Sequence, residues 1–412
     1  MNINSNIVII GCGMSGIAAA HRLIGAGFNN VRILEATGRS GGRIKTGKLG
    51  NSIVEIGANW IHGPSEGNPV FCLARQYGLL DPEALTPENQ AVDVAGHPPW
   101  VPNIFSSSGR RLKAETLRPA VEVFFELMQE SSEFHSKGGE PCASVGDFIR
   151  SKLQQRVAEI WKDVDANTRT LQMGAISSML KVECSVNGYL KKHHTTLFHP
   201  PLPLHKLHSI QRQGFGTNNK IFVEFDSPWW DADCEVIYLV WEDEDAIVDQ
   251  EPDVQRPWIK KLFGFTVLKP TERYGHILCG WIAGHESEYM ETLSEQEVMF
   301  AVTQLIRRFT GNPSITPRRI VRSQWFHDPW TCGSYSYPGK QCSMQDLENM
   351  MEPLPVKGLQ SRPLQVLFAG EATHPSYYST VHGALLSGWR EADRLISHYS
   401  SISPSQLAKA KL

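Results

Sequence analysis

The sequence lacks several features that would point to common classes of protein. It has no excess of positive charge, since 40 lysines and arginines face 43 aspartates and glutamates, for a net charge of −3. A nucleic-acid-binding face is therefore not expected. No apolar run approaches the length of a membrane-spanning helix, and six residues precede the first predicted strand. We accordingly expect neither a membrane span nor a secretory leader.

Closely spaced cysteine pairs are missing as well. The eight cysteines are scattered without a Cys-x-x-Cys motif. This pattern favours free thiols in a reducing compartment over disulfides or a zinc site. Adjacent histidines occur at His193 and His194, but two neighbouring histidines without further ligands do not make a metal centre, and we interpret them as exposed linker. At 412 residues, the chain suits two or three domains with ample buried cores.

The first motif that is present lies at the N-terminus. An apolar run, residues 7–10, ends in a Gly-x-Gly-x-x-Gly sequence, and a helical pattern and a second apolar run follow. This is the order of a βαβ dinucleotide-binding unit. Gly11 allows the tight turn, Gly13 lets the backbone approach a pyrophosphate, and Gly16 lets helix and strand pack closely.

An acidic residue, Glu35, ends the second apolar run. A carboxylate at this place accepts hydrogen bonds from ribose hydroxyls and repels a 2′-phosphate. The motif therefore predicts FAD or NAD, and not NADP. An NAD-dependent dehydrogenase remains an alternative at this point.

A second glycine-rich loop, which is also basic, follows at residues 36–43. Arg39, Gly42 and Arg43 could hold the phosphates from a second side, which a nicotinamide enzyme does not need. A surface turn with solvated arginines is the alternative. Residues 57–63 then set small residues around an aromatic ring and a histidine. This pattern suits backbone passing close under a flat ring, with the candidate cofactor contacts Gly57, Ala58, Asn59 and Trp60.

These motifs together resemble the FAD-dependent amine oxidase family. The resemblance rests on Gly-x-Gly-x-x-Gly, on Glu-Ala-x-x-Arg-x-Gly-Gly-Arg and on Gly-Ala-Asn-Trp-Ile-His-Gly-Pro. It resumes at residues 214–221, 333–337, 367–374 and 377–388. The order of motifs over most of the chain is that of the family.

The resemblance implies an α/β fold: a Rossmann-like FAD-binding domain with a second, α+β substrate domain. It divides the chain into residues 1–68 plus 360–400 for FAD, 69–190 for the helical part of the substrate domain and 217–345 for its sheet. From the residue patterns we predict helices at 69–78, 114–135, 144–153, 168–179 and 381–399, and strands at 219–225, 236–241, 261–268, 276–282 and 364–369. Ser294 and Glu297 form a predicted capping box.

The implied activity is oxidation of secondary amines of N-acetylated polyamines, with hydride transfer to FAD and reoxidation by dioxygen to hydrogen peroxide. Lys220 resembles the family's lysine that holds a water against the flavin, although a surface lysine fits the strand pattern too. His62 resembles a residue on the substrate side. Further residues implied at the site are Gly370, Glu371, Thr380 and Val381 for the cofactor and Trp325, Tyr335, Tyr378, Ser379 and Thr380 for the substrate. Ser379 and Thr380 could bond an acyl carbonyl, and Glu371 could accept from cofactor hydroxyls.

The family pattern is broken at one place, residues 191–216. Relatives carry there a further stretch on the order of a hundred residues, about one small domain. Removing strands of a doubly wound sheet exposes apolar edges and deletes groups that satisfy the cofactor. The alternatives are a truncated isoform that binds FAD weakly and lacks catalysis, or a sequence whose natural form is complete.

The chain ends in Ala410-Lys411-Leu412, which is similar to the Ser-Lys-Leu signal of the peroxisomal import receptor. We therefore expect a peroxisomal protein, with a cytoplasmic location as the alternative.

Overall fold

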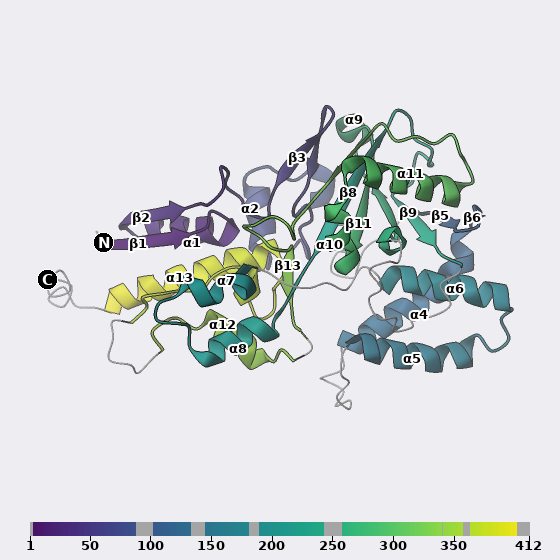
Figure 1. Ribbon diagram of the computed structural model, residues 1–412. Helices are drawn as coiled ribbons and strands as arrows, with labels where there is room; N and C mark the ends of the chain where they lie inside the picture. The colour runs from purple at the N-terminus through teal and green to yellow at the C-terminus, as the bar shows by residue number, and fades with distance from the viewer. Residues whose placement is uncertain are drawn as a thin grey trace.

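The computed structural model describes residues 3–87, 102–132, 145–180, 189–242, 258–339, 341–356 and 363–401, and arranges them in two parts (Figure 1). One part is built around the parallel pair β1 (Ile3–Ile10) and β2 (Phe28–Leu34). The other is built around a seven-stranded sheet. The C-terminal residues 410–412 lie outside the described residues.

The predicted βαβ unit is confirmed in the first part. Helix α1 (Met14–Gly25) follows β1 and packs against the closing helix α13 (Val381–Ser401), as Figure 1 shows. The two helices can approach closely because Gly388 has no side chain. A Cβ at this position would lie 2.2 Å from the Ser15 carbonyl oxygen. Arg22 and Asp393 then form an ion pair at 2.6 Å across the exposed rim. Helix α13, although far away in the sequence, thus packs directly against the helix of the nucleotide-binding unit.

The larger sheet has a mixed strand order. It runs β12 (Arg319–Arg322), β8 (Asn218–Phe225), β11 (His276–Ala283), β10 (Gly264–Val267), β9 (Val236–Val240), β5 (Pro102–Ser106) and β6 (Arg111–Leu112). All neighbours pair antiparallel except β5 and β9, which are parallel. The predicted strands at 219–225, 236–241, 261–268 and 276–282 are present. Two strands, β5 and β6, lie within residues 69–190, the predicted helical part of the substrate domain, and extend the sheet.

Helices cover both faces of this sheet. Neighbouring residues of β5 show the two faces. Ile104 packs on one face with α4 (Ala114–Ser132), α5 (Val145–Ile160) and α6 (Ala166–Leu180). Phe105 lies on the other face, in the core under α11 (Glu295–Thr310). Short helix α10 (His285–Thr292) lies on the α11 side. The capping box is confirmed, since Ser294 accepts from the Glu297 N–H and Glu297 accepts from the Ser294 N–H.

A hairpin, β3 (Thr46–Leu49) and β4 (Ser52–Glu55), joins the two parts. Its apolar residues pack on Phe222 and Ile277 of the large sheet. Because side chains alternate along a strand, Lys220 lies on the same face as Phe222 and points toward this hairpin. The small sheet β13 (Tyr335–Tyr337) with β7 (Gly214–Gly216) lies at the same junction.

Two predictions about the connecting segments are wrong. The junction at 191–216, expected to be linker around His193 and His194, contains α7 (Tyr189–Leu197) and α8 (Leu204–Arg212), and α8 packs on α12 (Met344–Met351). Apolar residues at helical spacing, such as Leu207 and Ile210, bury one side of α8 and stabilise the helix. The expected strand at 364–369 is irregular, because its only strand-like pairing among the described residues is a bridge between Val366 and Leu354.

The remaining helices are short or lie at the periphery. They are α2 (Pro69–Gln76), which packs on α13, α9 (Thr271–Tyr274), and the 3₁₀ turns η1 (Pro82–Leu85), η2 (Trp258–Lys261) and η3 (Glu371–Thr373). No helix in the described part of the chain is long and apolar enough to cross a membrane.

The parallel sheet of the first part has an unusual feature: it consists of two strands. Within the described ranges β1 pairs only with β2. Apolar side chains on this pair stay open to solvent, with Val8 57%, Ile10 88% and Leu34 57% exposed. Parallel strands are normally covered on both faces, so this pair lacks part of its cover.

Candidate active site

The glycine turn after β1 has the geometry that a pyrophosphate needs. Gly11 has a φ of 100°, which favours glycine, and a Cβ at Gly16 would meet the Gly11 carbonyl oxygen at 2.1 Å. Gly13 has open space where its Cβ would stand. It also occupies the N-cap of α1, which has no side-chain cap and no acidic residue in its first turn. The positive end of the helix dipole therefore faces the cavity, and no carboxylate in the first turn of the helix neutralises it.

Glu35 lies directly beside this turn. Its carboxylate accepts from the backbone N–H groups of Thr37 and Cys12, both at 2.8 Å. These hydrogen bonds, that of Thr37 first, lower the pKa of Glu35. The carboxylate is exposed at the cavity wall, so it keeps capacity to accept from ribose hydroxyls.

The second glycine loop lies on the first, as the sequence suggested. The Gly41 N–H donates to the Cys12 carbonyl oxygen at 2.7 Å, and a Cβ at Gly42 would lie 3.3 Å from the Gly13 Cα. The predicted contact of Arg39 with the phosphates stays a prediction. The Arg39 guanidinium donates to the carbonyl oxygens of its own loop, including Ile44 at 3.2 Å, and thus shapes the loop.

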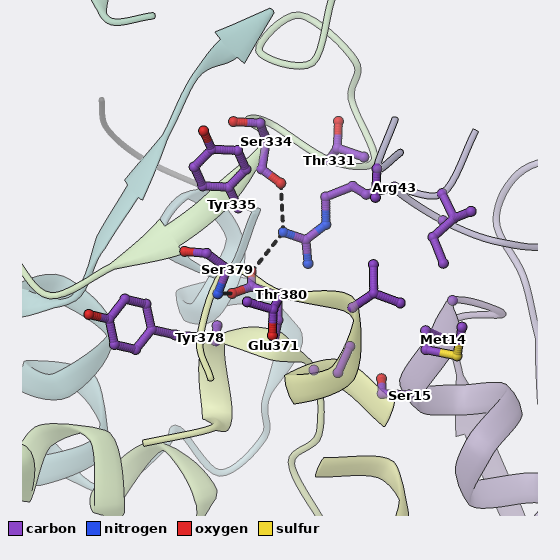
Figure 2. A pocket seen from close by; sticks show the side chains of 18 of the residues that line it. Met14, Ser15, Arg43, Thr331, Ser334, Tyr335, Glu371, Tyr378, Ser379 and Thr380 are labelled. Carbon is purple, nitrogen blue, oxygen red and sulfur yellow. Dashed lines mark hydrogen bonds and ion pairs between the residues drawn. The ribbon is translucent and has the colours of Figure 1, made fainter. Parts of the chain in front are cut away.

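Arg43 and Glu371 join the N-terminal loop to the C-terminal return of the chain (Figure 2). Arg43 Nη1 donates to Glu371 Oε1 and to the Ser334 carbonyl oxygen, each at 2.8 Å. Glu371 also accepts from the Ser336 N–H and hydroxyl and from the Ser379 N–H. These four donors take up the lone-pair positions of the carboxylate. In this structure Glu371 orders the surrounding loops, and its contact with cofactor hydroxyls stays a prediction.

Lys220 reaches the cavity from β8 as a buried ammonium group. Its Nζ donates to the carbonyl oxygens of Glu55 and Gly57 and to Asn59 Oδ1, at 2.8 Å for Glu55 and 2.7 Å for Asn59. The Trp281 ring lies opposite on β11, with its centre 4.7 Å from Nζ. Burial lowers the pKa of Lys220 to about 8. The surface-lysine alternative is wrong, because the side chain is only 4% exposed.

Aromatic rings line the space next to Lys220. Trp60 stacks on Trp281 with ring centres 5.1 Å apart and meets His62 at 6.3 Å. Trp60 is 45% exposed, whereas Trp325 on the wall is buried. Flat apolar walls of this kind suit a ring system or an aliphatic chain.

The hydroxyl residues at the start of α13 are already engaged within the protein. Ser379, with a φ of 65°, donates its hydroxyl hydrogen to the Ser336 carbonyl oxygen. Thr380 donates to the Tyr377 carbonyl oxygen at 2.7 Å and accepts from the Gly383 N–H. Each hydroxyl has one hydrogen to donate, so neither is available for an acyl carbonyl in this structure. A bond from this pair to an acyl carbonyl stays a prediction.

One cavity of ≈ 3090 Å³ connects all of these groups. It is lined by every site residue that the sequence predicted, namely Gly11, Gly13, Gly16, Glu35, Arg39, Gly42, Arg43, Gly57, Ala58, Asn59, Trp60, His62, Lys220, Trp325, Tyr335, Gly370, Glu371, Tyr378, Ser379, Thr380 and Val381. Glu35 and Glu371 thus open onto the same space past Lys220. Groups of three or more side chains arranged to hold a metal ion are not found among the described residues.

Comparison with known proteins identifies the family of this chain. Residues 14–131 and 150–396 match the family model described as flavin containing amine oxidoreductase. The chain belongs to this family. The match favours a flavin over the nicotinamide alternative, and the cofactor is FAD.

Curated relatives and solved structures agree with this assignment. The chain is 38% identical to the human peroxisomal N(1)-acetyl-spermine/spermidine oxidase over 95% of this chain and 94% of the relative. It is 28% identical to polyamine oxidase 1 of rice, Oryza sativa subsp. japonica, over 95% of this chain and 97% of the relative. A redesigned putrescine oxidase has the same fold, with a TM-score of 0.60 at 16% identity over 96% of this chain and 99% of that one.

The open cavity fits FAD at the adenosine end. The glycine turn leaves room for phosphates at Gly13, the N-terminus of α1 points at that room, and Glu35 stands where a ribose would lie. Sequence reasoning missed several groups that hold this site together, notably Glu55, Trp281 and Ser336. Their roles depend on strand register and on backbone carbonyl groups, for which a single sequence carries no local signal.

Proposed function

We propose that this chain oxidises a secondary amine of N-acetylated polyamines, with dioxygen as the electron acceptor. The observation that supports this most is the buried Lys220 ammonium group in the cavity that also contains the glycine turn and His62. The name of the human relative supplies the substrate class. Bound FAD would supply the hydride acceptor, and its reoxidation by dioxygen would yield hydrogen peroxide.

The residues next to Lys220 favour the reactive form of an amine. An alkylamine has a pKa of about 10 and must lose its proton before a hydride can leave the adjacent carbon. The positive charge of the buried Lys220 disfavours a second cation nearby. His62 lies against Trp60, where its ring can bond the amine. Water would then hydrolyse the imine product to an aldehyde and a shorter amine.

A comparison of three substrates tests the proposal. We expect N(1)-acetylspermine to reduce the flavin with a kcat/KM at least about 10-fold above that of spermine, because spermine carries one more ammonium group into an apolar cavity. Putrescine has only primary amines and serves as the control, with no measurable reduction. Faster reaction of spermine would reject the preference for acetylated substrates, and no reaction with either would reject polyamine oxidation.

Relatives also support a location. The human and bovine relatives are named as peroxisomal. These names support a peroxisomal location for this chain.

A second part of the proposal concerns the two-stranded sheet. The alignment with the human relative covers 487 positions although the chain has 412 residues, so at least 75 positions have no counterpart here. The exposed Val8 and Ile10 line the cavity or its edge, and the same cavity is bordered by Leu190, Leu197 and Phe198 of the 189–198 segment. We propose that the relatives' extra segment belongs at this junction and covers β1, and that its absence weakens FAD binding.

A further inference from the structure

A buried carboxylate on the far side of the sheet has no part in the function proposed above. Glu291, on α10, is 4% exposed. It accepts hydrogen bonds from Asn219 Nδ2 at 2.6 Å, from the Phe326 N–H at 2.9 Å, and from the N–H and Nδ1 of His327, both at 2.9 Å. Burying a carboxylate costs free energy unless donors surround it. Four donors surround the Glu291 carboxylate and offset the cost of its burial. A carboxylate held in this way is fixed in position.

A chain of hydrogen bonds leads from Glu291 to the backbone of Lys220. Asn219, whose amide nitrogen donates to Glu291, accepts at Oδ1 from the Ser323 hydroxyl at 2.8 Å. The Ser323 oxygen in turn accepts from the Lys220 N–H at 2.8 Å, and the Ser323 N–H donates to the Lys220 carbonyl oxygen at 3.0 Å. Neighbouring side chains of a strand point to opposite faces, so Asn219 faces Glu291 while Lys220 faces the cavity.

The same carboxylate also holds the segment that carries Trp325. The Trp325 N–H donates to Asn219 Oδ1 at 3.3 Å, and the next two backbone N–H groups, those of Phe326 and His327, donate to Glu291 itself. Two elements that bring side chains to the cavity, β8 and the segment after β12, are therefore tied to one buried group. Hydrogen bonds thus link the backbones of Lys220 and Trp325 to the same buried carboxylate through Asn219.

We propose that Glu291 is a positioning residue that sets Lys220 and the Trp325 wall relative to the flavin. This inference rests on the proposed function, because it assigns the buried network a purpose in flavin reduction. Glu291 acts through Asn219 and Ser323 and does not reach the cavity. Misplacement of a reacting group by about 1 Å can cost on the order of 100-fold in rate, so a small relaxation of this network has a large kinetic effect.

Two serine-to-alanine substitutions separate positioning from simple stability. Ser323 and Ser287 are both buried, at 2% and 0% exposed, and both contact the Asn219 side chain. Only Ser323 continues to Lys220. We expect Ser323→Ala to lower the limiting rate of anaerobic flavin reduction by about 10-fold, with flavin content and substrate KM within about twofold of the starting protein. Ser287→Ala, the matched control, should leave the rate within about twofold.

Substitution of the carboxylate itself gives the larger effect. Glu291→Gln replaces one accepting oxygen with an NH₂ group that faces donors, and we expect the reduction rate to fall on the order of 100-fold. If this variant fails to fold, the comparison of Ser323→Ala with Ser287→Ala still tests the positioning role. In a double variant, Glu291→Gln with Ser323→Ala, the losses should not add, because both substitutions break one path.

The outcomes distinguish this inference from the proposed function. A starting protein that no polyamine reduces would reject the proposed function alone. The reoxidation of photoreduced flavin by dioxygen then serves as the readout, since the Lys220 ammonium group would lie near the transferred charge without any substrate. Slower reaction in Ser323→Ala than in Ser287→Ala would support the positioning role. Equal rates in the two serine variants, in either assay, would overturn it.

Discussion

Replacing Lys220 by methionine is expected to slow flavin reduction by a saturating polyamine on the order of 100-fold, with little change in flavin content. Methionine fills similar space but removes the positive charge that, in the proposed function, would lie beside the flavin. The charge is held by Glu55, Gly57 and Asn59. Stopped-flow absorbance under anaerobic conditions measures the rate directly.

The pH dependence of the same reaction identifies the group. With the pKa of Lys220 lowered to about 8 by burial, the side chain is charged below pH 8 and neutral above it. The limiting reduction rate of the starting protein should therefore decline as the pH rises through about 8. Lys220→Met should lack this decline, because no group titrates there. If the decline persists unchanged in Lys220→Met, a group other than Lys220 causes it.

A second buried lysine provides the matched control. Burial also lowers the pKa of Lys206 to about 8, but its Nζ donates to carbonyl oxygens at the end of α12, including Glu352 at 2.8 Å. Lys206→Met should lower the melting temperature and leave the reduction rate within about threefold. Equal losses of rate in both variants would mean that burial, and not position beside the flavin, explains the effect of Lys220.

The second large effect is expected from inserting the segment that, in our proposal, the relatives carry and this chain lacks. Inserting the aligned segment of the human relative at residues 195–199 should tighten FAD binding at least about 10-fold. It should also raise the melting temperature by about 5 °C or more, because burial of Val8, Ile10 and Leu34 contributes about 1.5–3 kcal/mol each. Isothermal titration with FAD and thermal unfolding measure the two effects.

A linker of Gly and Ser residues, equal in length to the segment, controls for the insertion itself. It should leave FAD affinity unchanged and lower the melting temperature slightly, since a longer loop costs little. If the natural segment changes FAD affinity no more than the linker does, β1 does not receive its cover from that segment.

Local signals explain which features could be predicted from the sequence. The glycine turn, the capping box at Ser294 and the helix from Val381 each depend on residues within a few positions of one another. The site residues were found because motifs mark them. They were brought into one cavity by the packing of α13 on α1, which the sequence shows only through the family resemblance.

Nonlocal pairing explains what was missed. β5 joins the sheet parallel to β9, more than a hundred residues later in the chain, and a pairing over that distance leaves no local signal in the sequence. The partners of Glu371 could not be predicted either, because Arg43 lies 328 residues away in the sequence. The hydroxyl hydrogens of Ser379 and Thr380 are taken by nearby carbonyl groups, a competition that residue identity does not reveal.

The claim on which this account depends is that one elongated cavity, from the glycine turn and Glu35 past Arg43 to Lys220, holds a single FAD. Titrating the purified chain with FAD and with FMN, while following flavin fluorescence, tests it most directly. The account predicts one FAD per chain and an affinity for FAD at least about 10-fold above that for FMN, which lacks the adenosine half that would meet Glu35. A chain that stays colourless, or that binds FMN as tightly as FAD, would contradict it.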